Sequence, residues 1–352
     1  MRLLRGLALL TVAGCSQGRA GAPAPESVQR LEQVSGTSTL LQAVSPVDER
    51  IVWVSGHAGT YARTLDGGTT WHAGRVPGDT TLQFRDVYAA DANTAWLMSA
   101  GNGDKSKIFR TTDGGQSWTL QFTNTEPRAF YDCMDFWDPL HGIAMSDEVD
   151  GRTPILMTTD GGAHWTLSPT APAAQPGEGG FAASGTCLIT RPGGHAFIAT
   201  GNGARARLLH SRDYGMTWSA DTLPLASGSG IGSTSAAFRD LINGAVLGGN
   251  VGDNAGRTDN VAVTQDGGRT WRNGARPPFA GAVFGSAYVP GARHPALIAA
   301  GPRGLAWSAD DGASWVPVDT LAYWAVGAAS PNAAWAVGPR GRITRLSGFP
   351  AR

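Results

Sequence analysis

The chain has 352 residues and carries 28 basic and 28 acidic side chains, so its formal net charge is zero. This balance excludes nucleic acid as the main partner, because binding an acidic polymer requires a basic surface. Glycine is abundant, at 49 residues, and charged residues make up only 16% of the chain, which favours many short strands joined by tight turns.

The first residues have the pattern of an export signal. A basic segment, "MRLLR", precedes an apolar segment that ends in "VAGC" (12–15). This ending resembles the lipobox of bacterial lipoproteins, whose cysteine is lipidated and becomes the first residue of the mature chain. We therefore expect a signal peptide over residues 1–14, lipidation at Cys15 and a polar tether over 15–27.

Ordinary signal cleavage is the alternative, but its best site, "AGA" (20–22), is followed by Pro23, which disfavours cutting. Ser16 after the lipidated cysteine resembles the outer-membrane sorting case. We expect an exported lipoprotein of the outer membrane that faces the periplasm. No apolar run reaches 18 residues, so we expect no membrane-spanning helix.

The N-terminal segment after the tether, "VQRLEQVSG" (28–36), reads as a strand without a repeat of its own. The chain then repeats one pattern, which is clearest over residues 82–122. Apolar segments at 82–90, 94–100, 107–111 and 118–122 predict four short strands in succession. Four antiparallel strands in each repeat are typical of one blade of a β-propeller.

Each repeat contains an octet such as "TTDGGQSW" (111–118), which occurs six times. The octets recur every 44 to 53 residues, and this interval indicates a propeller or a solenoid. Their aspartates and tryptophans are Asp66 and Trp71, Asp113 and Trp118, Asp160 and Trp165, Asp213 and Trp218, Asp266 and Trp271, and Asp310 and Trp315.

The octet has the residues of a tight turn. The aspartate can accept hydrogen bonds from backbone N–H groups two or three residues on, and glycine at the fifth position tolerates a positive φ. The tryptophan is expected to be buried between neighbouring strands. The octet resembles the Asp-box, or BNR, repeat, and we interpret the six aspartates as turn formers rather than catalysts.

A seventh repeat over residues 320–346 has three strands but no octet and no fourth strand. The unmatched segment 28–36 can supply that strand, which closes the ring and removes an exposed edge. We therefore predict an all-β fold: a monomeric seven-bladed propeller over residues 28–349, with four-stranded antiparallel blades and the N-terminal strand completing the last blade.

The segments "FYDCMDFWDPLHGIAMSD", "TTDGGAHW" and "PGEGGFAASGT" within residues 130–186 resemble a bacterial branch of the photosystem II stability/assembly factor family. The resemblance covers residues 28–349. It implies a propeller without catalytic activity that acts as an assembly scaffold for a membrane or periplasmic protein. Bacterial relatives are often labelled oxidoreductase or glycosyl hydrolase by transfer, and we give these labels little weight.

The sequence offers little support for enzymatic chemistry. Sialidases, which also contain Asp-boxes, carry an Arg-Ile-Pro motif, and this chain has none. "TGNGARA" (200–206) matches a dinucleotide-binding pattern, but no helix fits between it and the next octet, so we interpret it as a turn between strands. The seven histidines lack ligand spacing, and we expect no metal and no cofactor.

Two cysteines remain in addition to Cys15. Alignment of the repeats places Cys133 and Cys187 at equivalent positions of the innermost strands of adjacent blades. These positions can be too far apart for a disulfide, which requires Cα atoms within about 7 Å. We expect two buried thiols, with a disulfide as the alternative that an oxidising periplasm permits.

The long polar loops are the candidate functional region. In a propeller, the loops between second and third strands and those between blades emerge on one face, called here the long-loop face; the octets lie on the opposite, Asp-box face. Function on rigid scaffolds concentrates in such loops. The candidates for partner or ligand binding are Asp147, Glu148, Asp150, Glu178, Asn202, Asn250, Asp253 and Asp259, with Arg303 and Arg340 across the ring.

Three interpretations of these loop residues remain open. They are solvated loop charges, a surface that binds a protein or peptide, or a site that binds or hydrolyses a glycan. In the last case Asp147 and Glu178 would be the acid and base, and glycosidase carboxyls lie about 5–10 Å apart. We favour a binding scaffold, with a sialidase-like glycan hydrolase as the alternative.

Overall fold

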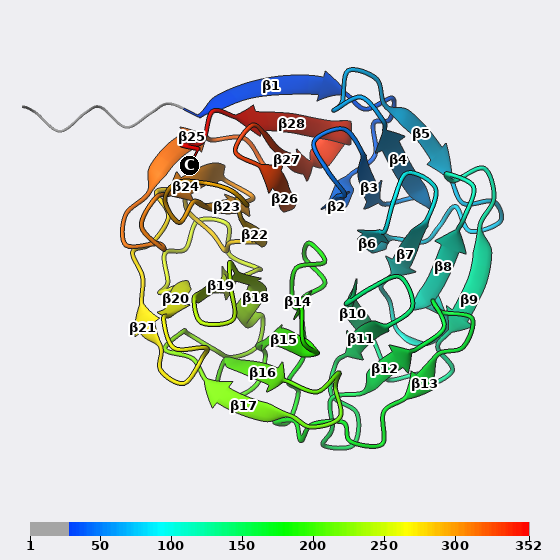
Figure 1. The fold of residues 1–352 in the computed structure, drawn as a ribbon. Coiled ribbons are helices and arrows are strands. Elements are labelled where there is room, and N and C mark those ends of the chain that lie inside the picture. The colour runs from blue at the N-terminus through cyan, green and yellow to red at the C-terminus, as the bar shows by residue number, and fades with distance from the viewer. Residues whose placement is uncertain (1–27, 352) are drawn as a thin grey trace, which may run out of the picture.

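The structure is a computed structural model that describes residues 28–351. The expected signal peptide (1–14), Cys15 and the tether (15–27) lie outside the described residues. Seven four-stranded antiparallel sheets stand around a central axis, and each forms one blade (Figure 1). This confirms the predicted seven-bladed propeller.

The strands of the first four blades follow one another along the chain. They are β2 (Leu41–Pro46), β3 (Val52–Gly56), β4 (Thr60–Thr64) and β5 (His72–Arg75); β6 (Phe84–Ala89), β7 (Ala95–Ser99), β8 (Lys107–Thr111) and β9 (Thr119–Thr123); β10 (Tyr131–Phe136), β11 (Gly142–Ser146), β12 (Ile155–Thr158) and β13 (Thr166–Leu167); β14 (Leu188–Arg191), β15 (His195–Thr200), β16 (Arg207–Ser211) and β17 (Ser219–Thr222).

The last three blades continue the order, and the N-terminal strand completes the seventh. Their strands are β18 (Ile231–Phe238), β19 (Gly244–Asn250), β20 (Val261–Thr264) and β21 (Arg272–Asn273); β22 (Gly285–Tyr288), β23 (Leu297–Gly301), β24 (Gly304–Ser308) and β25 (Val316–Asp319); β26 (Ala325–Ser330), β27 (Ala333–Gly338), β28 (Arg342–Ser347) and β1 (Gln29–Val34). Two short 3-10 helices, η1 (Gly103–Lys105) and η2 (Pro339–Gly341), lie in loops.

The ring closes where the N-terminal strand pairs with the last one. β1 pairs antiparallel with β28 over its whole length, from Gln29 opposite Ser347 to Val34 opposite Arg342. β1 therefore lies at the outer rim of blade 7, as Figure 1 shows. The predicted closure is confirmed, and β28 has a partner instead of an exposed edge.

The core lies between the blades. Trp53, Trp96 and Trp335 on the second strands of blades 1, 2 and 7 are fully buried. In each of these blades an arginine of the third strand stacks on that tryptophan, with its Cζ atom 5.1–5.8 Å from the ring centroid. The octet tryptophans are less buried than we expected, since Trp71 is buried but the other five are partly exposed.

The octets form the turns between third and fourth strands. In every octet the aspartate accepts a hydrogen bond of 2.8–2.9 Å from the backbone N–H four residues on. We had expected a donor two or three residues on; the turn is wider because the chain winds around the carboxylate. The glycine at the fifth position has a positive φ in all six octets, as predicted.

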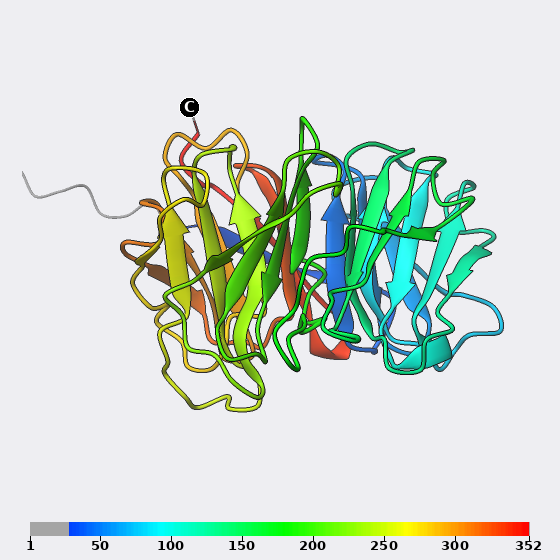
Figure 2. The same ribbon diagram turned by 90° about the horizontal axis from the view of Figure 1, so that it is seen from below.

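The two faces of the ring differ, as Figure 2 shows from the side. The long-loop face carries η1 and η2, and the Asp-box face lies next to the C-terminus. Residues 201–206 form a turn between β15 and β16, so the dinucleotide-like motif is a strand connection, as predicted. Across residues 28–351 no helix has the length and hydropathy that crossing a membrane requires.

Candidate functional site

The central channel is blocked on the long-loop side by residues 179–186, the segment that leads into β14. We call this segment the plug; Figure 1 shows the chain before β14 reaching into the middle of the ring. Its backbone pairs with blade 4, where Gly179 and Gly201 exchange two hydrogen bonds. On the far side of the channel, Gln42 of blade 1 donates a hydrogen bond of 3.0 Å to the Ala182 carbonyl.

The plug also contacts blades 5 and 6. Ser184 donates a hydrogen bond of 2.7 Å to the Phe284 carbonyl of blade 6, and the Thr186 hydroxyl lies 2.7 Å from that of Ser235 in blade 5. Phe181 and Ala183 pack against an apolar cluster that contains Phe284 and Trp324. The plug is therefore held by side chains from around the ring and belongs to the core.

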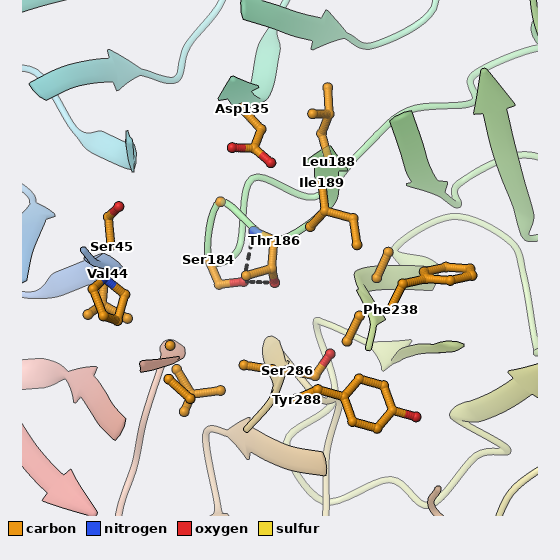
Figure 3. Close-up of a pocket in the computed structure, with 18 of the residues that line it drawn as sticks. Val44, Ser45, Asp135, Ser184, Thr186, Leu188, Ile189, Phe238, Ser286 and Tyr288 are labelled. Carbon is orange, nitrogen blue, oxygen red and sulfur yellow. Dashed lines mark hydrogen bonds between the residues drawn. The ribbon is translucent and has the colours of Figure 1, made fainter. Parts of the chain in front are cut away.

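A cavity of about 490 Å³ remains on the Asp-box side of the plug (Figure 3). The first strands of all seven blades line it, and Ser184 and Thr186 of the plug form part of its wall. Its size is within the range of small-molecule sites. It is the channel of the propeller, reduced to a pocket that opens on the Asp-box face.

Two carboxyl groups lie in the wall of this cavity. Asp86 accepts a hydrogen bond of 2.6 Å from the Met134 N–H, and Asp135 accepts one of 2.7 Å from the Thr190 N–H. Each carboxyl therefore joins the first strand of its own blade to that of the next. Burial raises the pKa of both groups, and that of Asp86 lies well above its ordinary value.

A second pair of carboxyl groups lies beneath the plug on the long-loop side. Asp132 of β10 is buried, and Asp147 follows β11. One oxygen of each carboxyl has no N–H or O–H partner among the described residues. The two groups lie close enough to share a proton, and burial, followed by the neighbouring charge of Asp147, raises the pKa of Asp132 well above its usual range.

This pair predicts a pH dependence of stability. Burial raises the pKa of Asp147 to about 6, whereas an unfolded aspartate has a pKa of about 4. The Asp147 carboxyl therefore contributes a loss of stability as the pH rises from about 4 to about 6, by roughly 1.4 kcal/mol for each unit of difference in pKa. Asp147→Asn should reduce this loss, with Asp132 contributing the remainder, and make the protein more stable than wild type at pH 7.

Urea unfolding at a series of pH values measures this effect. Asp259→Asn is the matched control, because Asp259 is an exposed aspartate in another loop of the long-loop face. Identical pH profiles for Asp147→Asn and wild type would show that the pair does not bury a charge.

Glu178 has no exposed side-chain area and forms an ion pair with Arg207 of β16. It also accepts hydrogen bonds from the Thr200 hydroxyl at 2.6 Å and from the Gln175 N–H at 2.7 Å. Glu178 therefore fixes the base of the plug to blade 4. It cannot reach a substrate in this structure, so Asp147 and Glu178 do not form the acid and base pair that a hydrolase needs.

Most of the other predicted residues stabilise the loops in which they lie. Glu148 accepts a hydrogen bond from the Gly151 N–H, Asp150 pairs with Arg128, Asn202 accepts from Gly230, Asn250 accepts from Gly252, and Asp253 accepts from Ala255 and Gly256. Asp259, Arg303 and Arg340 are exposed. The structure brings together Asp147, Glu148 and Glu178 at the plug, and the remaining residues are spread over blades 3 to 7.

The residues that our sequence reasoning missed lie around the plug. Phe181 and Trp324 are partly exposed on the long-loop face, and Arg85 stacks over the Phe130 ring at 5.9 Å. No sequence signal separated Trp324 from the other tryptophans outside the octets and second strands, because Trp307 is one of these and is buried in the core.

Cys133 and Cys187 form a disulfide, with their Cα atoms 5.9 Å apart. Our expectation of two free thiols is therefore wrong. The first strands of adjacent blades converge toward the axis, so equivalent positions come within bonding distance there. The bond fixes the end of the plug to blade 3.

Among residues 28–351 no three His, Cys, Asp or Glu side chains gather as metal ligands would.

Comparison with known proteins supports the fold and leaves the activity open. No protein-family model matches the sequence, and no curated protein matches it. Among solved structures, YCF48 bound to D1 peptide is 17% identical with a TM-score of 0.66, and the match covers 93% of this chain and 99% of that one. YCF48 from Cyanidioschyzon merolae is 14% identical with a TM-score of 0.65, covering 90% and 98%.

A third similar structure is an enzyme, the GH74 xyloglucanase from Xanthomonas campestris. It is 15% identical with a TM-score of 0.61, and the match covers 90% of this chain but only 53% of the xyloglucanase. These identities are too low to carry a function over. The likeness to YCF48, a photosystem II assembly factor, agrees at the level of fold with the family resemblance seen in the sequence.

Proposed function

We propose that this protein is a non-catalytic scaffold, exported and lipid-anchored at Cys15, that binds a polypeptide partner at the centre of its long-loop face. The observation that carries the proposal is the plug. A hydrolase needs a deep pocket with accessible carboxylates, whereas the plug fills this mouth and Glu178 is fully buried beneath it.

The surface over the plug has the composition of a binding face. Phe181 and Trp324 are partly exposed at its centre, and Arg303 and Arg340 are exposed around it. Aromatic and arginine side chains supply most of the binding energy in protein interfaces. The similar structure of YCF48 bound to D1 peptide supports a polypeptide ligand.

Crosslinking in native membranes tests the proposal. The chain is tagged at its C-terminus, and captured proteins are identified by mass spectrometry. We expect Arg303→Glu combined with Arg340→Asn to lower recovery of the partner about tenfold, the effect of removing hot-spot contacts worth roughly 1.4 kcal/mol or more. Asparagine is chosen at residue 340 because Arg340 has a φ of 58°.

Arg269→Glu is the matched control, since Arg269 is an exposed arginine on the Asp-box face. It should leave recovery unchanged. Capture of no protein above background, or equal capture by both variants, would contradict a partner site on the long-loop face.

Glycan binding is the second candidate function, and the cavity on the Asp-box side favours it. That cavity is lined by the carboxyls of Asp86, which is buried, and Asp135, which is partly exposed, and a GH74 enzyme has a similar fold. Glycan arrays and hydrolase screens with wild type and Asp135→Asn test this alternative. Binding or turnover that the substitution abolishes would favour it over the scaffold.

A further inference from the structure

Exposed apolar side chains are distributed unequally between the two faces. Ten large hydrophobic residues are exposed within the described chain. Four of them lie in the outer strands β1, β9 and β13, none lies in a loop of the long-loop face, and six lie in turns of the Asp-box face. Those six are Leu65, Leu140, Tyr214, Met216, Leu241 and Ile242.

Five of the six belong to adjoining blades. Leu140, Tyr214, Met216, Leu241 and Ile242 lie on blades 3 to 5, and we call them the turn patch. The centroid of the Tyr214 ring in blade 4 lies 5.2 Å from that of Trp137. Trp137 belongs to the turn of blade 3 that also carries Leu140, so this contact joins the two blades. On the other side, Leu241 and Ile242 share a surface hollow with His195 and Arg212 of blade 4.

Tyr214 occupies a position that does not favour it. It has a φ of 58°, and four of the other five octets have glycine at this position. A tyrosine in the left-handed region is strained, because its Cβ atom approaches the backbone. Its ring contacts Trp137 and His141, yet the residue remains 45% exposed. Tyr214 therefore adds an apolar surface to this face of the molecule.

The chain enters the propeller on the same face as the turn patch. β1 begins at Gln29, opposite Ser347 at the end of β28, and Val28 packs against the cluster that contains Phe349. Both contacts lie at the Asp-box end of blade 7. The 12 residues between Cys15 and Val28 reach at most about 45 Å, so a lipid at Cys15 holds the entry point of the chain within that distance of the bilayer.

From the turn patch and the entry point of the chain, we infer that the Asp-box face lies on the lipid bilayer. The inference rests on the proposed lipid anchor. The acyl chains on Cys15 would hold the protein at the membrane, and contact of the turn patch with the bilayer would set which face points toward it. Tyrosine, leucine, isoleucine and methionine suit the level between headgroups and acyl chains.

The charge of this face decides which lipid chemistry matters. Arg212 and Arg269 lie in the hollow beside the turn patch, but Asp213, Asp240 and Asp266 lie on the same turns. Attraction to anionic headgroups is therefore small, and apolar contact provides the affinity. The turn patch should therefore contact bilayers made of phosphatidylcholine alone, and this contact should depend little on salt concentration. The long-loop face then points away from the bilayer, toward its partner.

Photocrosslinking of the full, lipidated protein in vesicles tests this orientation. A benzophenone amino acid is placed at Tyr214 or Ile242, and in separate samples at Leu120 or Arg303. Leu120 is 47% exposed on an outer strand, which matches the exposure of Tyr214, and Arg303 lies on the long-loop face. We expect about tenfold more lipid adduct at residues 214 and 242 than at residues 120 and 303.

A substitution series provides the second measurement. Tyr214→Asn, Leu241→Ser and Ile242→Ser combined should lower the lipid adduct of a benzophenone amino acid at residue 140, which lies in the same turn patch, about tenfold. Leu120→Ser with Leu167→Ser, which removes two exposed leucines from outer strands, should have no effect.

The outcomes separate this inference from the proposed function. Mass spectrometry of the N-terminal peptide shows whether Cys15 carries lipid. An unlipidated Cys15 would overturn the anchor and the orientation together. With lipid present, equal adducts at all four positions, or protein rather than lipid adducts at residues 214 and 242, would overturn the orientation alone. Capture of a partner through the long-loop face is measured independently.

Discussion

Replacing Cys133 and Cys187 by alanine is expected to lower the free energy of unfolding by about 4 kcal/mol, the loop-closure value for a disulfide that spans about 54 residues. The bond joins two first strands and encloses the outer strands of blade 3 and the plug. Without it, the unfolded chain gains the freedom of that whole loop. Urea unfolding of the variant and of wild type under oxidising conditions measures the loss.

The single variants provide the control. Cys133→Ala and Cys187→Ala each break the same bond, so each should cost nearly as much as the double variant, and their effects should not add. Additive effects of the two single variants would show that the bond is absent. So would the detection of two free thiols per molecule when wild-type protein is unfolded without reductant and its thiols are titrated. Because Cys187 directly follows the plug, we also expect faster proteolysis at residues 168–186 in all three variants.

Arg207→Ala is expected to cost 3–5 kcal/mol, about the penalty for leaving a buried charge without its partner. Arg207 is the only ionic partner of Glu178 in the described chain, and the Glu178 side chain has no exposed area. Removal of the guanidinium leaves a carboxylate that the Thr200 hydroxyl and the Gln175 N–H stabilise only in part. Urea unfolding at neutral pH measures the change.

Glu178→Gln with Arg207→Met is the matched control, because it removes both charges and keeps the volume. Replacing a buried ion pair by neutral groups of similar size is often close to neutral in stability, so the double variant should be more stable than Arg207→Ala. If Arg207→Ala costs less than about 1 kcal/mol, water screens the pair and Glu178 is not the anchor of the plug.

The sequence predicted the repeating architecture because each repeat marks its own turn. The octet fixes where the third strand ends, and the apolar segments before it fix the other strands; the segment 107–111, for example, is β8 itself. The missing fourth strand of the seventh repeat and the unmatched segment 28–36 had one economical solution, which the β1–β28 pairing confirms. The turns and strands were predictable because they follow from local sequence patterns, and the closure of the ring was predictable from the number of strands in each repeat.

The candidate site was predictable only in outline. The length of loop 168–185 indicated an unusual segment, but its path depends on side chains from several other blades, such as Gln42 and Phe284. The sequence therefore gave no reason to separate Glu178, which is buried, from Asp259, which is exposed. Both are acidic residues in polar loops, and only the neighbours that the fold brings to them differ.

By itself the sequence determined the strand order, the turns and the closure of the ring, because hydrogen bonding within a blade involves residues close in the chain. Only the tertiary structure decided the Cys133–Cys187 bond and the path of the plug. These features lie near the axis, where strands far apart in sequence converge. Distances and burial there depend on the number of blades and on how closely they pack, which no local pattern records.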